Sequence, residues 1–131
     1  MPDTPDNSSP SVYASDLPSV DPERMEMLRE LCQDADPDML REMLASWETE
    51  AARNLANAHA AVASADLTTL KAAAHAIKGS CANMGIVRLS ELGHLLEHQS
   101  EAPAIAAAIV EEMTTEFHRT QRLLAEIVAQ S

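Results

Sequence analysis

The positions of proline and glycine constrain the fold of this chain more than any other feature. No proline occurs between residues 38 and 102 or after residue 103, and all three glycines lie between residues 79 and 93. Such stretches permit long helices, because helix interiors tolerate proline and glycine least. The chain also has 23 alanines, but only eleven valines and isoleucines together and three aromatic residues. Since strands favour β-branched and aromatic residues, we predict an all-α fold.

The length and the two ends of the sequence suggest one domain. Residues 1–19 of the 131 hold four of the seven prolines and few large apolar side chains, so we predict a disordered tail there and a single domain over residues 20–131. No signal peptide is recognisable, and the longest aliphatic run, residues 104–110, is far shorter than the roughly 20 residues that span a bilayer. The two cysteines, Cys32 and Cys81, suit a reducing compartment as free, buried side chains. We therefore expect a soluble cytoplasmic protein.

Apolar residues recur at helical spacing in five segments. The first helix is short and follows the start signal Asp21-Pro22-Glu23, with Met25, Leu28, Leu31 and Cys32 on its apolar side. The other four are predicted from Asp36-Pro37-Asp38 to about Ser64, from Asp66 to Gly85, around residues 89–96, and from about Pro103 onward. Each of these four helices has one apolar stripe, which must be buried against another helix. Because the connections are short, we predict an antiparallel up-down four-helix bundle with the first helix capping one end.

The charge is strongly negative overall but locally positive. Nine Lys and Arg stand against 21 Asp and Glu, a formal net charge of −12, which argues against nucleic acid or an anionic membrane as a partner. Residues 68–90, however, contain Lys71, Lys78 and Arg88 and no acid. We expect the functional face of the protein in this window. We also expect salt to slow association with an acidic partner site.

His75 lies in the middle of that window. On a helical wheel its side chain falls about 135° from the centre of the apolar stripe, so it should point outward. Lys71 and Lys78 flank it by one turn on each side, and Gly79 stands four residues on. A neutral imidazole can attack phosphorus, the lysines would offset the charge of an added phosphoryl group, and a glycine would leave room for a partner to approach. A lone exposed histidine is usually an ordinary surface residue, but the combination favours phosphoryl acceptance.

The sequence around His75 resembles the signature of the histidine-containing phosphotransfer (HPt) domain. The matching run is His75-Ala76-Ile77-Lys78-Gly79-Ser80-Cys81-Ala82-Asn83-Met84-Gly85-Ile86, and the likeness extends over roughly residues 24–128. This resemblance implies that His75 is the phosphoacceptor. It also implies roles in assisting the phosphoryl group or docking a receiver domain for Lys71, Lys78, Gly79, Ser80 and Ala82. Gly85 would mainly end the helix.

The resemblance also implies a function. The protein would relay a phosphoryl group between aspartates of receiver domains, those of a hybrid sensor kinase or a response regulator, through phosphohistidine at His75. No Gly-rich nucleotide-binding segment is present, so we expect a stoichiometric carrier rather than a kinase. We expect no cofactor or metal on this chain, Mg²⁺ on the partner receiver, and a monomer.

Two other functions stay open. The protein could be a pseudo-HPt adaptor that binds a receiver or kinase without carrying phosphate. Alternatively, His94 and His98, spaced by four residues with Glu91 and Glu97 nearby, could form part of a metal site in a helical bundle. We expect a solvated polar face there instead, since the sequence places no third ligand.

Overall fold

Five helices make up the part of the chain that the structure describes. The computed structural model describes residues 16–36 and 38–130. Its elements are α1 (Pro22–Ala35), α2 (Met39–Ser64), α3 (Leu67–Asn83), α4 (Val87–Gln99) and α5 (Pro103–Ala129). Within the described ranges, strand-like pairing is limited to one isolated bridge between Val20 and Ile86. The predicted all-α fold is confirmed.

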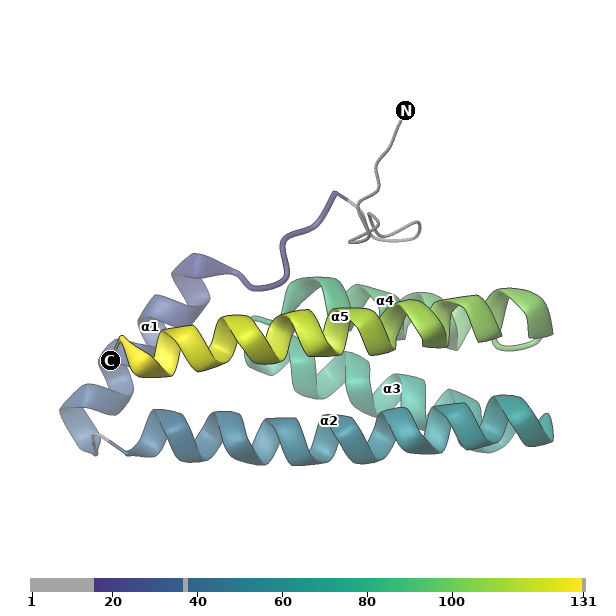
Figure 1. Ribbon diagram of the computed structural model, residues 1–131, viewed down its shortest axis with the longest axis horizontal. Coiled ribbons are helices and arrows are strands. Elements are labelled where there is room, and N and C mark those ends of the chain that lie inside the picture. The colour runs from purple at the N-terminus through teal and green to yellow at the C-terminus, as the bar shows by residue number, and fades with distance from the viewer. Residues whose placement is uncertain (1–15, 37, 131) are drawn as a thin grey trace.

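Helices α2 to α5 form a four-helix bundle. Each packs against two others, so that α2, α3, α4 and α5 close into a ring, and α1 packs against α2. Figure 1 shows α2 and α5 running the full length of the bundle, with the shorter α3 and α4 beside them. In the same view α1 lies at the end of the bundle where α2 begins and α5 ends. No helix in the described part of the chain is long and apolar enough to cross a membrane.

The core forms from the predicted stripes, with Trp47 and Phe117 packed at 5.7 Å between ring centroids. Both cysteines are free and buried, as expected. In α1, one residue of the predicted apolar side is wrong: Leu31 is 62% exposed, while Met25, Leu28 and Cys32 are buried. The reason is that, among the described helices, α1 packs closely only against α2, which covers a narrow stripe. Leu31 falls about 100° from its centre.

Local sequence signals set the helix ends. The Asp21 carboxylate accepts from the backbone N–H of Glu23 at 3.0 Å, and that of Asp66 accepts from Thr69 N–H at 3.1 Å. The Thr69 hydroxyl donates to the other oxygen of Asp66 at 2.6 Å. This bond, followed by the one from the Thr69 backbone, lowers the pKa of Asp66. After α3, Gly85 takes a φ of +73°, a left-handed conformation that suits glycine. The helix itself ends at Asn83, so this turn lies two residues beyond it.

The N-terminal segment before α1 is held against the bundle. Val87 N–H donates to Ser19 O at 2.9 Å, and Arg88 Nε donates to Leu17 O at 2.6 Å. Ser19 is buried, and Leu17 packs on the core. Residues 17–19 were predicted to belong to a disordered tail, which is wrong, because their carbonyls accept from the start of α4. Residues 1–15 of that predicted tail lie outside the described residues.

Candidate functional site

His75 lies on the solvent face of α3. Its side chain is 69% exposed, whereas Ala74 and Ile77 on the same helix are fully buried. Gly79, one turn further along, is also exposed, and a Cβ built there would meet nothing within 4 Å. The orientation predicted from the helical wheel is therefore confirmed, and the surface next to the imidazole is open.

One carboxylate joins His75 to Lys78. His75 Nδ1 lies 3.1 Å from Glu97 Oε2, and Lys78 Nζ donates to Glu97 Oε1 at 2.9 Å. Glu97 comes from α4, 22 residues along the chain, and its side chain is 27% exposed. The hydrogen bond from Lys78, followed by the charge of that lysine and the contact with His75, holds the pKa of Glu97 below its usual range.

This contact determines which ring nitrogen is available for chemistry. An ionised carboxylate can only accept hydrogen bonds, so the neutral imidazole carries its proton on Nδ1. The lone pair of Nε2, the other ring nitrogen, is then unprotonated. Because the ring is largely exposed, this nitrogen is accessible from solvent.

Close packing of α4 on α3 brings Glu97 to His75. Gly93, one turn before Glu97, is buried, and a Cβ there would lie 3.0 Å from both Ala74 O and Lys78 N. Ser90 Oγ, on the same side of α4, donates to Lys78 O at 2.9 Å. Ser90, Gly93 and Glu97 therefore form a stripe along which α4 meets the backbone of α3. Sequence reasoning did not predict the contact between Glu97 and His75. The available signal was Gly93, a glycine one turn before Glu97, which permits close packing of two helices.

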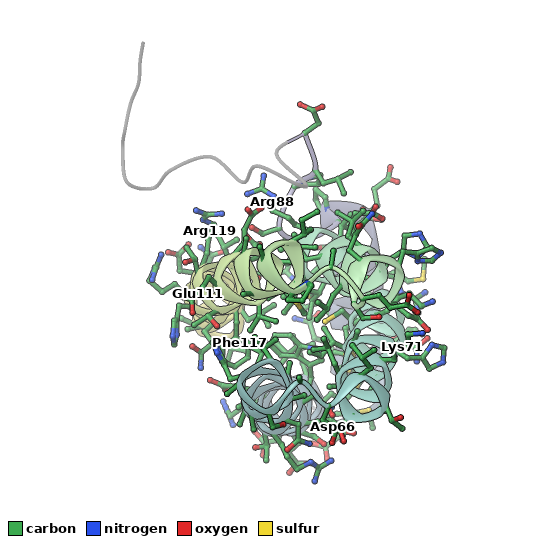
Figure 2. All side chains as sticks on the ribbon, turned by 90° about the vertical axis from the view of Figure 1, so that its right-hand side faces the viewer. Asp66, Lys71, Arg88, Glu111, Phe117 and Arg119 are labelled. Carbon is green, nitrogen blue, oxygen red and sulfur yellow. The ribbon has the colours of Figure 1, made fainter. Side chains whose placement is uncertain are left out.

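The positive window of the sequence is not a positive patch in space. Lys78 pairs with Glu97, and Lys71 Nζ lies 3.6 Å from Glu101 Oε2. Figure 2 shows Arg88 near Arg119, away from Lys71. Both arginines contact Glu116, a carboxylate on α5 with only 2% of its side chain exposed, at 3.5 and 2.7 Å. The prediction that salt slows association with an acidic partner site depended on the three unbalanced cations of this window. That basis is lost, because carboxylates on α4, on α5 and in the connection between them pair with these cations.

Other predicted site residues lie further along α3. Ala82 is exposed, whereas Ser80 is half-buried and lines a hollow between α2 and α3. The Ser80 hydroxyl donates to Ile77 O at 3.4 Å. The structure thus places Gly79 and Ala82 on the exposed surface of α3, and turns Ser80 toward α2.

The remaining histidines have other partners. His94 and His98 lie with ring centroids 4.3 Å apart, and His98 Nδ1 is 3.0 Å from His94 O. His59 Nε2 lies 2.8 Å from Thr114 Oγ1. In the part of the chain that the structure describes, no cluster of three or more potential metal ligands occurs.

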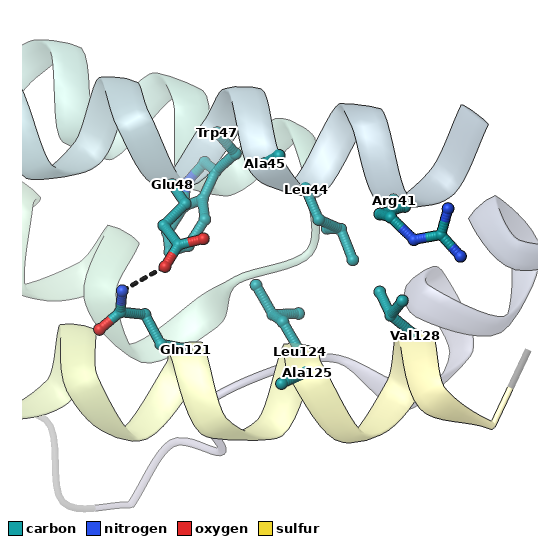
Figure 3. Close-up of a pocket in the computed structure, with 9 residues that line it drawn as sticks. All are labelled: Arg41, Leu44, Ala45, Trp47, Glu48, Gln121, Leu124, Ala125 and Val128. Carbon is teal, nitrogen blue, oxygen red and sulfur yellow. Dashed lines mark hydrogen bonds between the residues drawn. The ribbon is translucent and has the colours of Figure 1, made fainter. Parts of the chain in front are cut away.

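A pocket of about 290 Å³ lies between the first half of α2 and the last part of α5. Figure 3 shows it lined by apolar side chains such as Leu44 and Leu124, with a hydrogen bond between Gln121 and Glu48 across it. His75, Lys78 and Glu97 do not line this pocket, so it is separate from the candidate site.

Comparison with known proteins defines the class. The family model described as "Hpt domain" matches residues 42–129, so the chain belongs to the Hpt family and has a role in histidine phosphotransfer in phosphorelays. Among solved structures, it is similar to the histidine-containing phosphotransfer protein B of Pseudomonas aeruginosa PAO1. The TM-score is 0.75 and the identity 27%, over 87% of this chain and 97% of that one. No curated protein matches the sequence.

Proposed function

We propose that this protein accepts a phosphoryl group on Nε2 of His75 from a phosphoaspartate of one receiver domain and passes it to an aspartate of another. The observation that carries this proposal is the exposed His75 ring, held at Nδ1 by Glu97 and bordered by the open surface at Gly79. Membership of the Hpt family supports the same chemistry.

The lysines assist the transferred group. Lys78 Nζ bonds Glu97 at 2.9 Å and stands one turn from His75, so a modest rotation lets it meet a phosphoryl oxygen. Lys71, one turn before His75, is half-exposed, and its pair with Glu101 is open to solvent. A surface pair of this kind is worth little, about 0–1 kcal/mol, so Lys71 can exchange partners readily.

The partner supplies the rest of the site. Gly79 and Ala82 have no side chain and a small side chain, so the surface of α3 beside His75 is free of large groups. A receiver can therefore close over the ring. In this proposal the aspartate pocket and its Mg²⁺ belong to the receiver, and this chain is a cytoplasmic, monomeric, stoichiometric carrier without kinase activity. The receivers are those of a hybrid sensor kinase, a response regulator, or both.

Transfer from a labelled receiver tests this proposal. A receiver phosphorylated with labelled phosphate is mixed with the wild-type protein, with His75→Gln and with His59→Gln. The last is a matched control, because the native His59 side chain contacts Thr114 and lies outside the candidate site. We expect acid-labile label on the wild type and on His59→Gln, and none on His75→Gln. Equal labelling of His75→Gln and the wild type would overturn the assignment. Binding of the receiver without any labelling would favour the adaptor function.

A further inference from the structure

The two lysines beside His75 are each paired with a carboxylate, and the two pairs differ. Lys78 Nζ lies 2.9 Å from Glu97, and both side chains are partly buried. Lys71 Nζ lies 3.6 Å from Glu101 Oε2, where 48% of the lysine side chain and 76% of the glutamate side chain are exposed. We propose that Glu101 is a positioning residue that holds Lys71 away from the phosphoryl group, and so sets how readily phosphohistidine gives that group away. This inference rests on the proposed function, because it concerns transfer at the same histidine.

The backbone around Glu101 is held in a defined place. Glu101 lies in the short connection between α4 and α5. Ser100, just before it, is buried, and its hydroxyl donates to Glu97 O at 3.4 Å. Ala102 N–H, just after it, donates to Gln99 O at 3.1 Å. An ordered turn therefore presents the Glu101 carboxylate to α3, while the side chain itself stays exposed.

Lys71 can reach either anion. It stands one helical turn before His75 on α3, so the two side chains are neighbours on the helix surface. Its ammonium group carries three donors on a flexible chain, which suits a carboxylate or a phosphoryl oxygen equally well. Asp66, an acid at the start of the same helix, is engaged by Thr69 instead. Among the described residues, the ion pair of Lys71 is with Glu101.

Phosphorylation brings a second anion to this lysine. When Nε2 of His75 attacks a receiver phosphoaspartate, the bond between phosphorus and the aspartyl oxygen breaks, and the bond between phosphorus and nitrogen forms. The electron pair of the broken bond stays on the receiver carboxylate, and the proton on Nδ1 is not transferred. A phosphoryl group carries about two negative charges, so it attracts Lys71 more strongly than one carboxylate does at the same distance. Glu101 offsets part of that attraction, because Lys71 must leave it to reach the phosphoryl oxygens.

This competition makes phosphohistidine less stable relative to the phosphoaspartate of the receiver. A carrier must release its phosphoryl group as well as accept it, and an unpaired lysine beside the ring would favour the loaded state. Exposed ion pairs change an equilibrium by up to about fivefold. We therefore expect Glu101 to shift the equilibrium toward the phosphorylated receiver by about two- to fivefold.

The equilibrium constant for phosphoryl exchange with a receiver tests this inference. Labelled phosphoreceiver and protein are mixed in dilute solution with Mg²⁺, and the share of label on each is measured once it is constant. Since this constant compares the free proteins, a change in docking alone leaves it unaltered. The variants are Glu101→Gln, Lys71→Ala and the double variant. The matched control is Glu111→Gln, because Glu111 is an exposed glutamate that Figure 2 shows on the opposite side of the bundle from Lys71.

Each variant has its own expected result. Glu101→Gln keeps the shape of the side chain but removes its charge, so the equilibrium constant should move toward phosphohistidine by about two- to fivefold. Lys71→Ala should move it toward the phosphorylated receiver. In the double variant, replacing Glu101 should add nothing to the effect of Lys71→Ala, because the lysine that it holds is gone. Glu111→Gln should match the wild type.

The outcomes separate the two proposals. If the wild type accepts no label on His75, the proposed function fails, and this inference with it. If the wild type is labelled but Glu101→Gln leaves the equilibrium constant unchanged, the inference alone is wrong. It is also wrong if the effect of Glu101→Gln is the same with and without Lys71. Circular dichroism establishes that each variant is folded, and Glu101→Ala, which removes the same charge, replaces Glu101→Gln if that variant is not.

Discussion

Replacing Gly79 with alanine should make the protein more stable and less able to transfer phosphate. Alanine favours a helix interior over glycine by about 1 kcal/mol. At Gly79 the added methyl group meets nothing within 4 Å, so no packing cost opposes this gain. For a domain of this size the melting temperature should rise by about 4 °C. The same methyl group stands on the surface that a receiver must cover, where small displacements of reacting groups can slow a reaction by up to about 100-fold.

Gly93→Ala is the matched control, because it makes the same change in the same bundle. Its methyl group would lie 3.0 Å from two backbone atoms of α3, which cannot move independently of that helix. Overpacking of this kind costs about 1–3 kcal/mol, which offsets or exceeds the helical gain. We expect Gly93→Ala to be less stable than the wild type, and Glu97 to move away from His75 with α4.

Urea or thermal unfolding of the three proteins gives the stabilities, and transfer from a labelled receiver gives the rates. A Gly79→Ala protein less stable than the wild type would refute the inference that a methyl group at this position meets no other atom. A more stable Gly79→Ala protein that transfers at the wild-type rate would refute the role of Gly79 in partner approach. A more stable Gly93→Ala protein would show that α3 and α4 are not in backbone contact there.

Two further predictions concern stability. Gly85→Ala should destabilise the protein by about 1–2 kcal/mol in urea unfolding, because alanine is strained at φ +73° and its Cβ would meet the Arg24 side chain at 2.6 Å. Gly85→Asn brings the same Cβ but adopts a left-handed φ more readily, so it should be milder than Gly85→Ala. A Gly85→Ala protein as stable as the wild type would contradict this. Asp66 and Glu97 have pKa values below their ordinary 3.8 and 4.5 in the folded protein. Their stabilising contribution is therefore complete above those values and is lost as the pH falls from them through the lower folded ones. Melting temperatures between pH 6 and pH 2 should decline less steeply in a double variant Asp66→Asn with Glu97→Gln, and an unchanged decline would count against both contacts.

The fold could be predicted because its boundaries depend on local chemistry. The Asp21 and Asp66 side chains cap the helices that follow them, and Gly85 supplies the left-handed turn after α3. Such signals act within a few residues, so the sequence contains them in readable form. The outward direction of His75 follows equally from helical periodicity, since the buried side of α3 is marked by apolar residues.

The contacts between helices could not be predicted in the same way. That Glu97 meets His75 depends on the rotation of α4 against α3, which is fixed by the backbone approach at Gly93. Counting charge in a window of sequence gave a positive patch because the balancing carboxylates, such as Glu101, lie on other segments. Leu31 matched the helical spacing, but nothing in the sequence shows that α1 is covered by one neighbour.

The hydrogen bond from Val87 to Ser19 bears on where a working fragment of this protein can be cut. Among the described residues no side chain caps the start of α4, and its first amide is satisfied by a carbonyl 68 positions earlier in the chain. A fragment that starts at residue 20, as composition alone suggests, would leave that amide without its acceptor. Because α4 also carries Glu97, losing the hydrogen bond between Val87 and Ser19 should disturb the contact between Glu97 and His75. A fusion or truncated form should therefore keep the chain from residue 16 onward.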